Sequence, residues 1–153
     1  MKLDKIKNFA KDMRRNIIFT AYKAGSKSAH IGGALSAADI MAVLYSDIMK
    51  IKKSKTIDQN RDRFILSKGH ACLAYYAALN LKNFISDEEL ETFEKDNSSL
   101  AGHPVKNKNL GIEFSNGSLG MGLSIGIGLA ISSKKKSKLF NVYSNCSIYP
   151  NNI

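Results

Sequence analysis

The chain contains three histidines, and each stands beside glycine or within a glycine-containing turn. His30 lies in the segment SAHIGG, His70 in RFILSKGH and His103 in AGHP. Glycine lets the backbone come close to a ligand, and histidine supplies a hydrogen-bond donor or carries a proton near neutral pH. A single histidine of this kind is more often a structural hydrogen-bonding group. Three such segments in one chain favour a shared ligand site.

A fourth segment, residues 117–130 (GSLGMGLSIGIGLA), predicts a glycine-rich helix that starts directly after a loop. The first N–H groups of a helix lack partners within the helix, and together with the helix dipole they favour a phosphate anion. Glycines further along, such as Gly126 and Gly128, are also typical of a helix that packs closely against a neighbour. Both interpretations can hold, so we predict a site for a phosphorylated ligand at the start of this helix.

Two helices are expected before the second histidine. Residues 3–24 predict an amphipathic helix because apolar side chains recur every three or four positions, and Gly25 is a plausible stop. The predicted buried positions are Ile6, Phe9, Ala10, Met13, Ile17 and Ala21. A second helix is predicted to begin at Ser36, where SAAD has the form of a capping box. Ile40, Leu44 and Ile48 are its predicted buried stripe.

The remaining elements are expected to alternate between strand and helix. Residues 63–67 (RFILS) are short and apolar, which suits a buried strand of a parallel sheet. The next expected elements are a turn over 68–70, a helix over 71–81, a capped helix over 86–94, a loop over 96–116, a helix over 117–133 and a strand over 139–143. This order predicts an α/β fold with a parallel sheet flanked by helices. Ligands gather at the carboxyl ends of such strands, so His30, His70, His103 and Gly117 should share one face.

Composition sets broad bounds on the function. The chain has 153 residues, of which 44% are hydrophobic and 24% charged, as expected of one soluble domain. Its formal charge is +10, but the basic residues are spread out, with runs only at 50–55 and 134–138. Neither run is interleaved with aromatic residues, so a solvated lysine surface is favoured over nucleic-acid binding. The N-terminus has no apolar signal core and residues 117–133 fall short of the ~20 residues of a membrane span, so we expect a cytoplasmic protein without a membrane partner.

The two cysteines, Cys72 and Cys146, match no spacing typical of a metal or redox site. Cys72 lies in the apolar run after His70, where we expect a small buried thiol.

The four glycine-containing segments, taken in order over roughly residues 26–130, resemble the N-terminal half of transketolase, a thiamine diphosphate enzyme. In that family S-x-H-x-G precedes a helix, a strand runs into S-x-G-H-A, and G-H-P and G-x-L-G-x-G follow. The resemblance implies the thiamine diphosphate-binding fold. Met121 is a mild departure, since the family commonly has glutamine there.

The resemblance also implies roles for individual residues. His30 corresponds to a histidine that helps bind the sugar and handle protons near the reacting carbon, and His103 to one that contacts a substrate hydroxyl. We therefore predict both as catalytic residues. The implied cofactor-binding residues are His70, which donates to a diphosphate oxygen, and Gly117, Ser118 and Leu119 in the loop before the glycine-rich helix.

The resemblance fades at about Tyr143. In the family, a Gly-Asp-Gly turn and a later asparagine hold the Mg²⁺ or Ca²⁺ ion that accompanies the diphosphate, since such cations take oxygen ligands. Here residues 141–153 read NVYSNCSIYPNNI, and no acidic residue follows Glu113. Ser144 or Asn145 could offer a neutral oxygen but not the missing charge, so we predict no metal ligands. We expect residues 1–143 to be a partial diphosphate-binding domain, incomplete at its C-terminus, and residues 144–153 to be an unrelated tail.

By resemblance, the activity is transfer of a two-carbon ketol unit between sugar phosphates with thiamine diphosphate. We expect this chain to be a truncated or frame-shifted form, inactive alone. Its expected partner is a C-terminal half or subunit carrying the pyrimidine-binding domain, in a dimeric assembly.

Other functions remain open from sequence. A non-catalytic paralogue or assembly module would keep the domain surface without binding the cofactor. Another thiamine enzyme, such as a deoxyxylulose-phosphate synthase, would share the glycine-rich helix, although the G-H-P and S-K-G-H-A segments favour transketolase. Nucleic-acid binding is the least favoured, and salt-dependent retention on DNA would support it.

Overall fold

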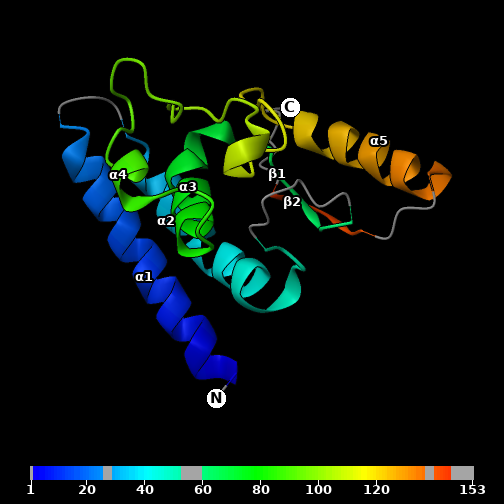
Figure 1. The fold of residues 1–153 in the computed structure, drawn as a ribbon, viewed down its shortest axis with the longest axis horizontal. Coiled ribbons are helices and arrows are strands. Elements are labelled where there is room, and N and C mark those ends of the chain that lie inside the picture. Colours follow the sequence, from blue (N-terminus) through cyan, green and yellow to red (C-terminus); the bar gives the residue numbers. More distant parts are fainter. Residues whose placement is uncertain (1, 26–28, 53–59, 137–139, 146–153) are drawn as a thin grey trace, which may run out of the picture.

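The structure of the chain is a computed structural model that describes residues 2–25, 29–52, 60–136 and 140–145. Helices α1 (Lys2–Lys23), α2 (Ile31–Val43) and α3 (Cys72–Leu81) pack against one another. Strands β1 (Arg63–Leu66) and β2 (Val142–Asn145) form a parallel pair, and α5 (Met121–Lys135) contacts both strands. Figure 1 shows the three packed helices on one side and α5 extending away from the body on the other. The predicted α/β architecture is confirmed.

Helix α1 matches its predicted extent, but two of its predicted buried residues, Ile6 and Phe9, are only half-buried. Ala10, Met13, Ile17 and Ala21 are buried, since a spacing of three or four residues aligns them on one face toward α2 and α3. Gly25 follows the helix with a φ of 71°, a backbone conformation that favours glycine, so the expected stop is also confirmed.

Helix α2 begins earlier than predicted, at Ile31, and continues through a π-helical turn (Leu44–Ile48). The predicted start at Ser36 is wrong: this hydroxyl donates to the carbonyl of Gly33, 2.8 Å away, inside the helix. The predicted stripe is wrong at Ile40 and Ile48, which are 56% and 46% exposed, whereas Leu44 is half-buried and packs against the core. The buried face consists of small or flexible residues, namely Ala34, Ala37, Ala38, Met41 and Ala42. Alanine lets α2 approach α1 and α3 closely, and the larger isoleucines turn outward.

By length and composition, Ile31–Ile48 could cross a membrane. The core helix of a soluble protein has the same character, and the alanine face of α2 packs on α1 and α3.

The sheet pairs Arg63 with Val142 and Leu66 with Asn145. Phe64, Ile65 and Leu66 are buried, as expected of a strand covered on both faces. The second strand lies further along the chain than predicted, since it starts at Val142 and includes Ser144 and Asn145. It therefore crosses the boundary expected at residue 143. Residues 146–153 of the predicted tail, Cys146 among them, lie outside the described residues.

Helix α3 anchors the loop that follows it. Almost all of its side chains are buried, and two of its tyrosines donate hydrogen bonds to that loop. Tyr75 Oη is 3.0 Å from the carbonyl oxygen of Gly111, and Tyr76 Oη is 2.7 Å from that of Ala101. The loop is thereby fixed on both sides of His103. It contains only a short 3-10 turn (Lys108–Leu110) and an isolated bridge in the part that is described.

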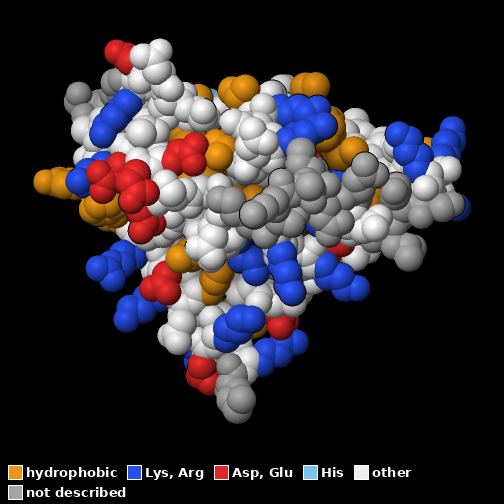
Figure 2. Space-filling model, in the orientation of Figure 1, with side chains coloured by type: hydrophobic (Ala, Val, Ile, Leu, Met, Phe, Trp, Pro, Cys, Tyr) orange, Lys and Arg blue, Asp and Glu red, His pale blue; other side chains and the backbone are white. Residues whose placement is uncertain are grey.

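The short helix α4 (Asp87–Leu90) ends earlier than the predicted residue 94, but its capping box is confirmed: the Glu89 N–H donates to Ser86 Oγ at 3.1 Å. Figure 2 shows acidic side chains gathered near α4, while lysines and arginines are scattered over the viewed face.

Candidate functional site

The three histidines come together, although they arise from separate parts of the chain. His30 lies immediately before α2, His70 lies in a short 3-10 turn (Gly69–Ala71) after β1, and His103 lies in the loop held by α3. The ring centroids of His30 and His70 are 5.6 Å apart, and those of His30 and His103 are 6.5 Å apart. His30 and His103 are exposed, so the cluster opens to solvent.

Two glycines make this convergence possible. A Cβ atom at Gly33 would lie 2.7 Å from Cδ2 of His70, and one at Gly69 would lie 2.7 Å from Cδ2 of His103. Real Cβ atoms do not approach other atoms so closely, so any larger residue would displace a ring. Gly33 and Gly69 therefore leave the space in which the rings of His70 and His103 lie.

Gly117 lies at the same cluster, since a Cβ atom there would be 3.8 Å from Cδ2 of His103. Ser118 is exposed and Leu119 half-buried, and both lead into Gly120, whose φ of 84° turns the chain into α5. The helix begins at Met121, later than the predicted residue 117, so the predicted ligand contacts lie in the preceding loop.

Ser67 joins the sheet to α5. Its hydroxyl accepts from the Gly122 N–H at 3.0 Å, and its own N–H donates to the carbonyl of Asn145 at 2.9 Å. The Gly122 N–H is thus already satisfied within the protein. A ligand at the start of this helix would therefore have to bind N–H groups that precede Gly122 in the chain.

Lys68 adds a positive charge beside the histidines. Its Nζ donates to Ser36 Oγ at 2.9 Å, and partial burial lowers the pKa of the ammonium from its usual value. Burial also lowers the pKa of His70, with smaller contributions from His30, Lys68 and His103. His70 is therefore favoured in its neutral form, in which one ring nitrogen donates and the other accepts.

From the sequence, Lys68, Ser67 and Ser36 were not predicted to belong to the site, and Ser36 was expected only to cap a helix. Lys68 and Ser67 lie inside the S-K-G-H-A segment, so their proximity to His70 was available from the sequence. The role of Ser36 was not, because its hydroxyl reaches Lys68 only after the start of α2 has been placed against the end of β1.

The described residues offer anion-binding groups but no metal site. Within residues 2–25, 29–52, 60–136 and 140–145, no group of three His, Cys, Asp or Glu side chains is placed to hold a metal ion. The three imidazole rings, the Lys68 ammonium and the backbone of the loop 117–119 fit a diphosphate by charge and hydrogen bonding. They do not fit the accompanying divalent cation, which takes carboxylate oxygens.

Cys72 is a buried thiol, as expected. It is 2% exposed, and its Sγ lies 3.1 Å from the carbonyl oxygen of Gly102. Burial raises the pKa of this thiol to about 12, so it is not a nucleophile at neutral pH.

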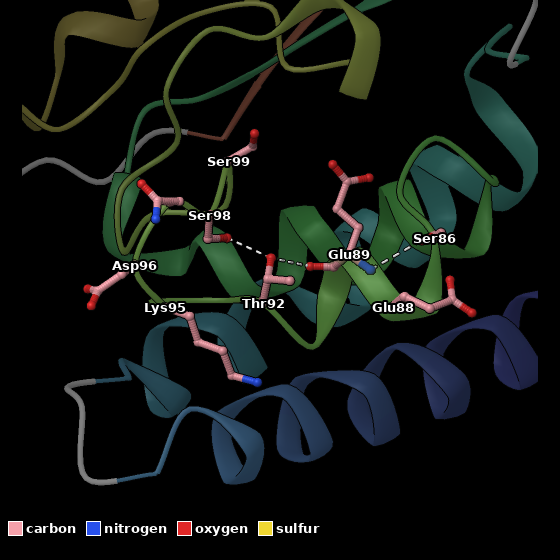
Figure 3. Close-up of a pocket in the computed structure, with 9 residues that line it drawn as sticks. Ser86, Glu88, Glu89, Thr92, Lys95, Asp96, Ser98 and Ser99 are labelled. Atoms are coloured by element: carbon pink, nitrogen blue, oxygen red, sulfur yellow. Dashed lines mark hydrogen bonds between the residues drawn. The ribbon is translucent and has the colours of Figure 1, made fainter.

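A separate cavity of about 600 Å³ lies beside α4 and is lined by hydroxyl and acidic side chains. Figure 3 shows that several of these groups bond to one another, including Thr92 to Ser98 at 2.7 Å. None of the predicted site residues lines it.

Comparison with known proteins gives a consistent result. Residues 7–149 match the family described as transketolase, thiamine diphosphate binding domain. The chain is 38% identical over 143 residues to one subunit of the apulose-4-phosphate transketolase of Phocaeicola vulgatus, covering 94% of this chain and 50% of that protein. It is 35% identical over 144 residues to the corresponding subunit from Actinobacillus succinogenes, covering 94% and 51%. The chain thus spans about half the length of these relatives.

The fold is also similar to solved structures. Transketolase from Leishmania mexicana superimposes with a TM-score of 0.83 at 28% sequence identity, over 92% of this chain and 22% of that one.

Proposed function

The chain belongs to the transketolase family, within its thiamine diphosphate-binding domain, and on this premise we propose that the histidine cluster binds the diphosphate part of thiamine diphosphate. One observation carries the proposal: three histidines from separate segments meet beside the loop 117–119. His30 and His103 are exposed, so burial of these two rings in the core does not explain why they meet. A shared ligand explains their convergence.

Each group has a distinct proposed task. Neutral His70 donates a hydrogen bond to a diphosphate oxygen, and the Lys68 ammonium offsets part of the diphosphate charge. Gly117, Ser118 and Leu119 contribute backbone N–H donors and leave room for close approach of the cofactor. His30 and His103, which are exposed at the mouth of the cluster, hold the sugar substrate and carry protons.

When bound, thiamine diphosphate supplies the attack on a ketose carbonyl, and the complete enzyme transfers a two-carbon unit between sugar phosphates. The two bacterial relatives are each named as one subunit of a transketolase, which supports a separate partner chain for this protein. We propose that this partner carries the pyrimidine-binding domain and that the pair assembles into a dimer of pairs.

We further propose that this chain alone does not turn over ketose phosphates. The cluster has no carboxylate for Mg²⁺ or Ca²⁺, and no acidic residue follows Glu113 in the sequence. The same observation favours a second function, a non-catalytic assembly module that keeps the domain surface. Cofactor binding separates the two, because the module would not bind thiamine diphosphate.

The test compares two lysine variants. Lys68→Met should weaken thiamine diphosphate binding about tenfold, since it removes one charge-assisted contact of roughly 1.4 kcal/mol. Lys82→Met is the matched control, because Lys82 is also partly buried with a lowered pKa but lies at the far end of α3. Calorimetric titration measures both. Equal affinities for the two variants would contradict the proposed contact of Lys68 with the cofactor, and no binding by the unmodified chain would support the assembly module instead.

Turnover is tested separately with the purified chain, thiamine diphosphate, Mg²⁺, a ketose phosphate donor and an aldose phosphate acceptor. No product is expected, and product formation by the chain alone would refute the proposed inactivity.

A further inference from the structure

A second cavity, of about 540 Å³, lies at the end of the sheet where β1 begins, away from the histidine cluster at the other end. One wall is formed by Arg63, the first residue of β1, whereas His70 follows the other end of that strand. The other walls come from the loop 106–114, the last turns of α5 and Phe140. Four separate segments of the chain therefore enclose it.

The charges that line this cavity are unbalanced. The positive residues are Arg63, Lys106, Lys108 and Lys136, and the single negative one is Glu113, so the lining charge is 4 − 1 = +3. Glu113 already forms ion pairs with Arg61 and Arg63, and all three side chains are at most 12% exposed. The two arginines thus neutralise the one carboxylate at the cavity, so the charges of the three lysines are in excess.

Two aromatic rings stand beside these cations. Lys106 Nζ lies 5.6 Å from the centroid of the Phe114 ring, and Arg63 Cζ lies 5.2 Å from that of Phe140. The quadrupole of an aromatic ring attracts a cation above its face. Each pair therefore places a positive charge beside an apolar ring in the cavity wall. Leu129 adds a further apolar wall. The combination suits a ligand that is anionic at one end and apolar or aromatic at the other.

We propose that this cavity binds an organic phosphate, with the phosphoryl group at the lysines and its apolar or aromatic part against Phe114, Phe140 and Leu129. Phosphate esters carry close to two negative charges at neutral pH, which matches the excess positive charge of the lining. The site is separate from the histidine cluster and does not depend on thiamine diphosphate binding.

The test measures AMP binding to the full chain by equilibrium dialysis with radiolabelled AMP at low ionic strength. The double variant Lys106→Gln with Lys136→Gln should weaken binding about tenfold, the effect of removing two partly screened phosphate contacts. The matched control is Lys134→Gln with Lys135→Gln. It removes the same amount of charge, at two residues in the last turn of α5 that stand next to Lys136 but do not line the cavity, and should leave the affinity unchanged.

A third variant, His70→Gln with His103→Gln, locates the site independently and should also leave AMP binding unchanged. Equal weakening in the two lysine variants would overturn the proposal, because it would show attraction to the overall charge only. Loss of binding in the histidine variant would place AMP at the other cluster, and absence of binding to the unmodified chain at millimolar AMP would likewise overturn it.

Discussion

At the scale of single residues, the site depends on how the protein environment alters His70. Its ring is half-buried, and burial disfavours the charged imidazolium. His30, Lys68 and His103 also lower the pKa of His70, because a positive charge on any of them repels a proton on its ring. A neutral histidine keeps one N–H for donation to an anion without adding to the repulsion inside the cluster.

We predict that His70 titrates below the usual value of 6.5 in the folded chain. The unfolded chain then takes up a proton first as the pH falls. The contribution of His70 to folding stability is therefore present above about pH 6.5 and is lost as the pH falls from there toward the folded pKa. NMR titration of the ring protons measures the folded pKa, and denaturant melts across this range measure the stability.

Lys68→Met should raise the pKa of His70 toward its usual value, because it removes one positive neighbour. Lys95→Met, a change beside α4, serves as the control. A pKa of His70 at or above 6.5 in the unmodified chain would contradict this description of the cluster.

The sequence was sufficient to predict which histidines meet, because three of the four glycine-containing segments could be assigned to the ends of elements. It was not sufficient to show the contacts of Lys68, whose partner Ser36 is 32 positions away. A lysine in a loop or turn is usually solvated, so only the packing of α2 on the end of β1 reveals its position.

At the scale of elements, two glycines of α5 differ in whether packing requires them. Gly122 faces the strand: a Cβ atom there would collide with Cβ of Ser67 and lie 2.8 Å from its Oγ. At Gly126 a Cβ atom would make ordinary contacts, 3.6 Å from Val142 Cγ1 and 3.7 Å from Ile65 Cδ1. The sequence predicted close packing through the later glycines, Gly126 and Gly128, and this is wrong: the tight contact is at Gly122, and a Cβ atom at Gly128 would meet no other atom within 4 Å.

Gly122→Ala should destabilise the fold by about 1–3 kcal/mol, since the added methyl group has no room against the backbone and side chain of Ser67. Gly126→Ala should stabilise it by about 0.5–1 kcal/mol, because alanine in a helix interior loses less conformational entropy on folding. Urea denaturation of the two variants measures both changes. The same sign for both would show that α5 is not seated on the strand in this way.

The start of α2 was predicted wrongly for a physical reason. A capping-box pattern indicates that a side chain can accept from the backbone, but Ser36 instead donates to the Gly33 carbonyl within the helix and accepts from Lys68. The stripe was wrong because large apolar residues were assumed to be inside. In α2 the alanines are buried, and close packing of three helices leaves Ile40 outside.

At the scale of the whole molecule, α5 carries apolar side chains that face solvent. Leu123, Ile127 and Ile131 recur every four residues on one stripe and are 59%, 53% and 52% exposed. The elements that α5 contacts most are the two strands, and Figure 1 shows its far end projecting from the body. An apolar stripe of this kind is typical of a surface that another part of an assembly covers.

We predict that the isolated chain associates with itself as its concentration rises, because that stripe is exposed. Ile127→Lys should shift the sedimentation profile toward monomer by placing a charge at the centre of the stripe. Ile40→Lys is the control, since Ile40 is similarly exposed, at 56%, but stands on α2. A monomeric, cooperatively unfolding wild-type chain would instead indicate a self-sufficient small domain.

Titration of the chain with thiamine diphosphate tests most directly whether the three histidines form one cofactor site. Because the sequence has only three histidines, their Hε1 ring protons give three NMR signals that single His→Gln variants assign. We predict that the signals of His30, His70 and His103 shift together along one binding curve, with the largest change at His70. Three signals that stay unmoved at millimolar thiamine diphosphate, or movement of one alone, would contradict a shared site.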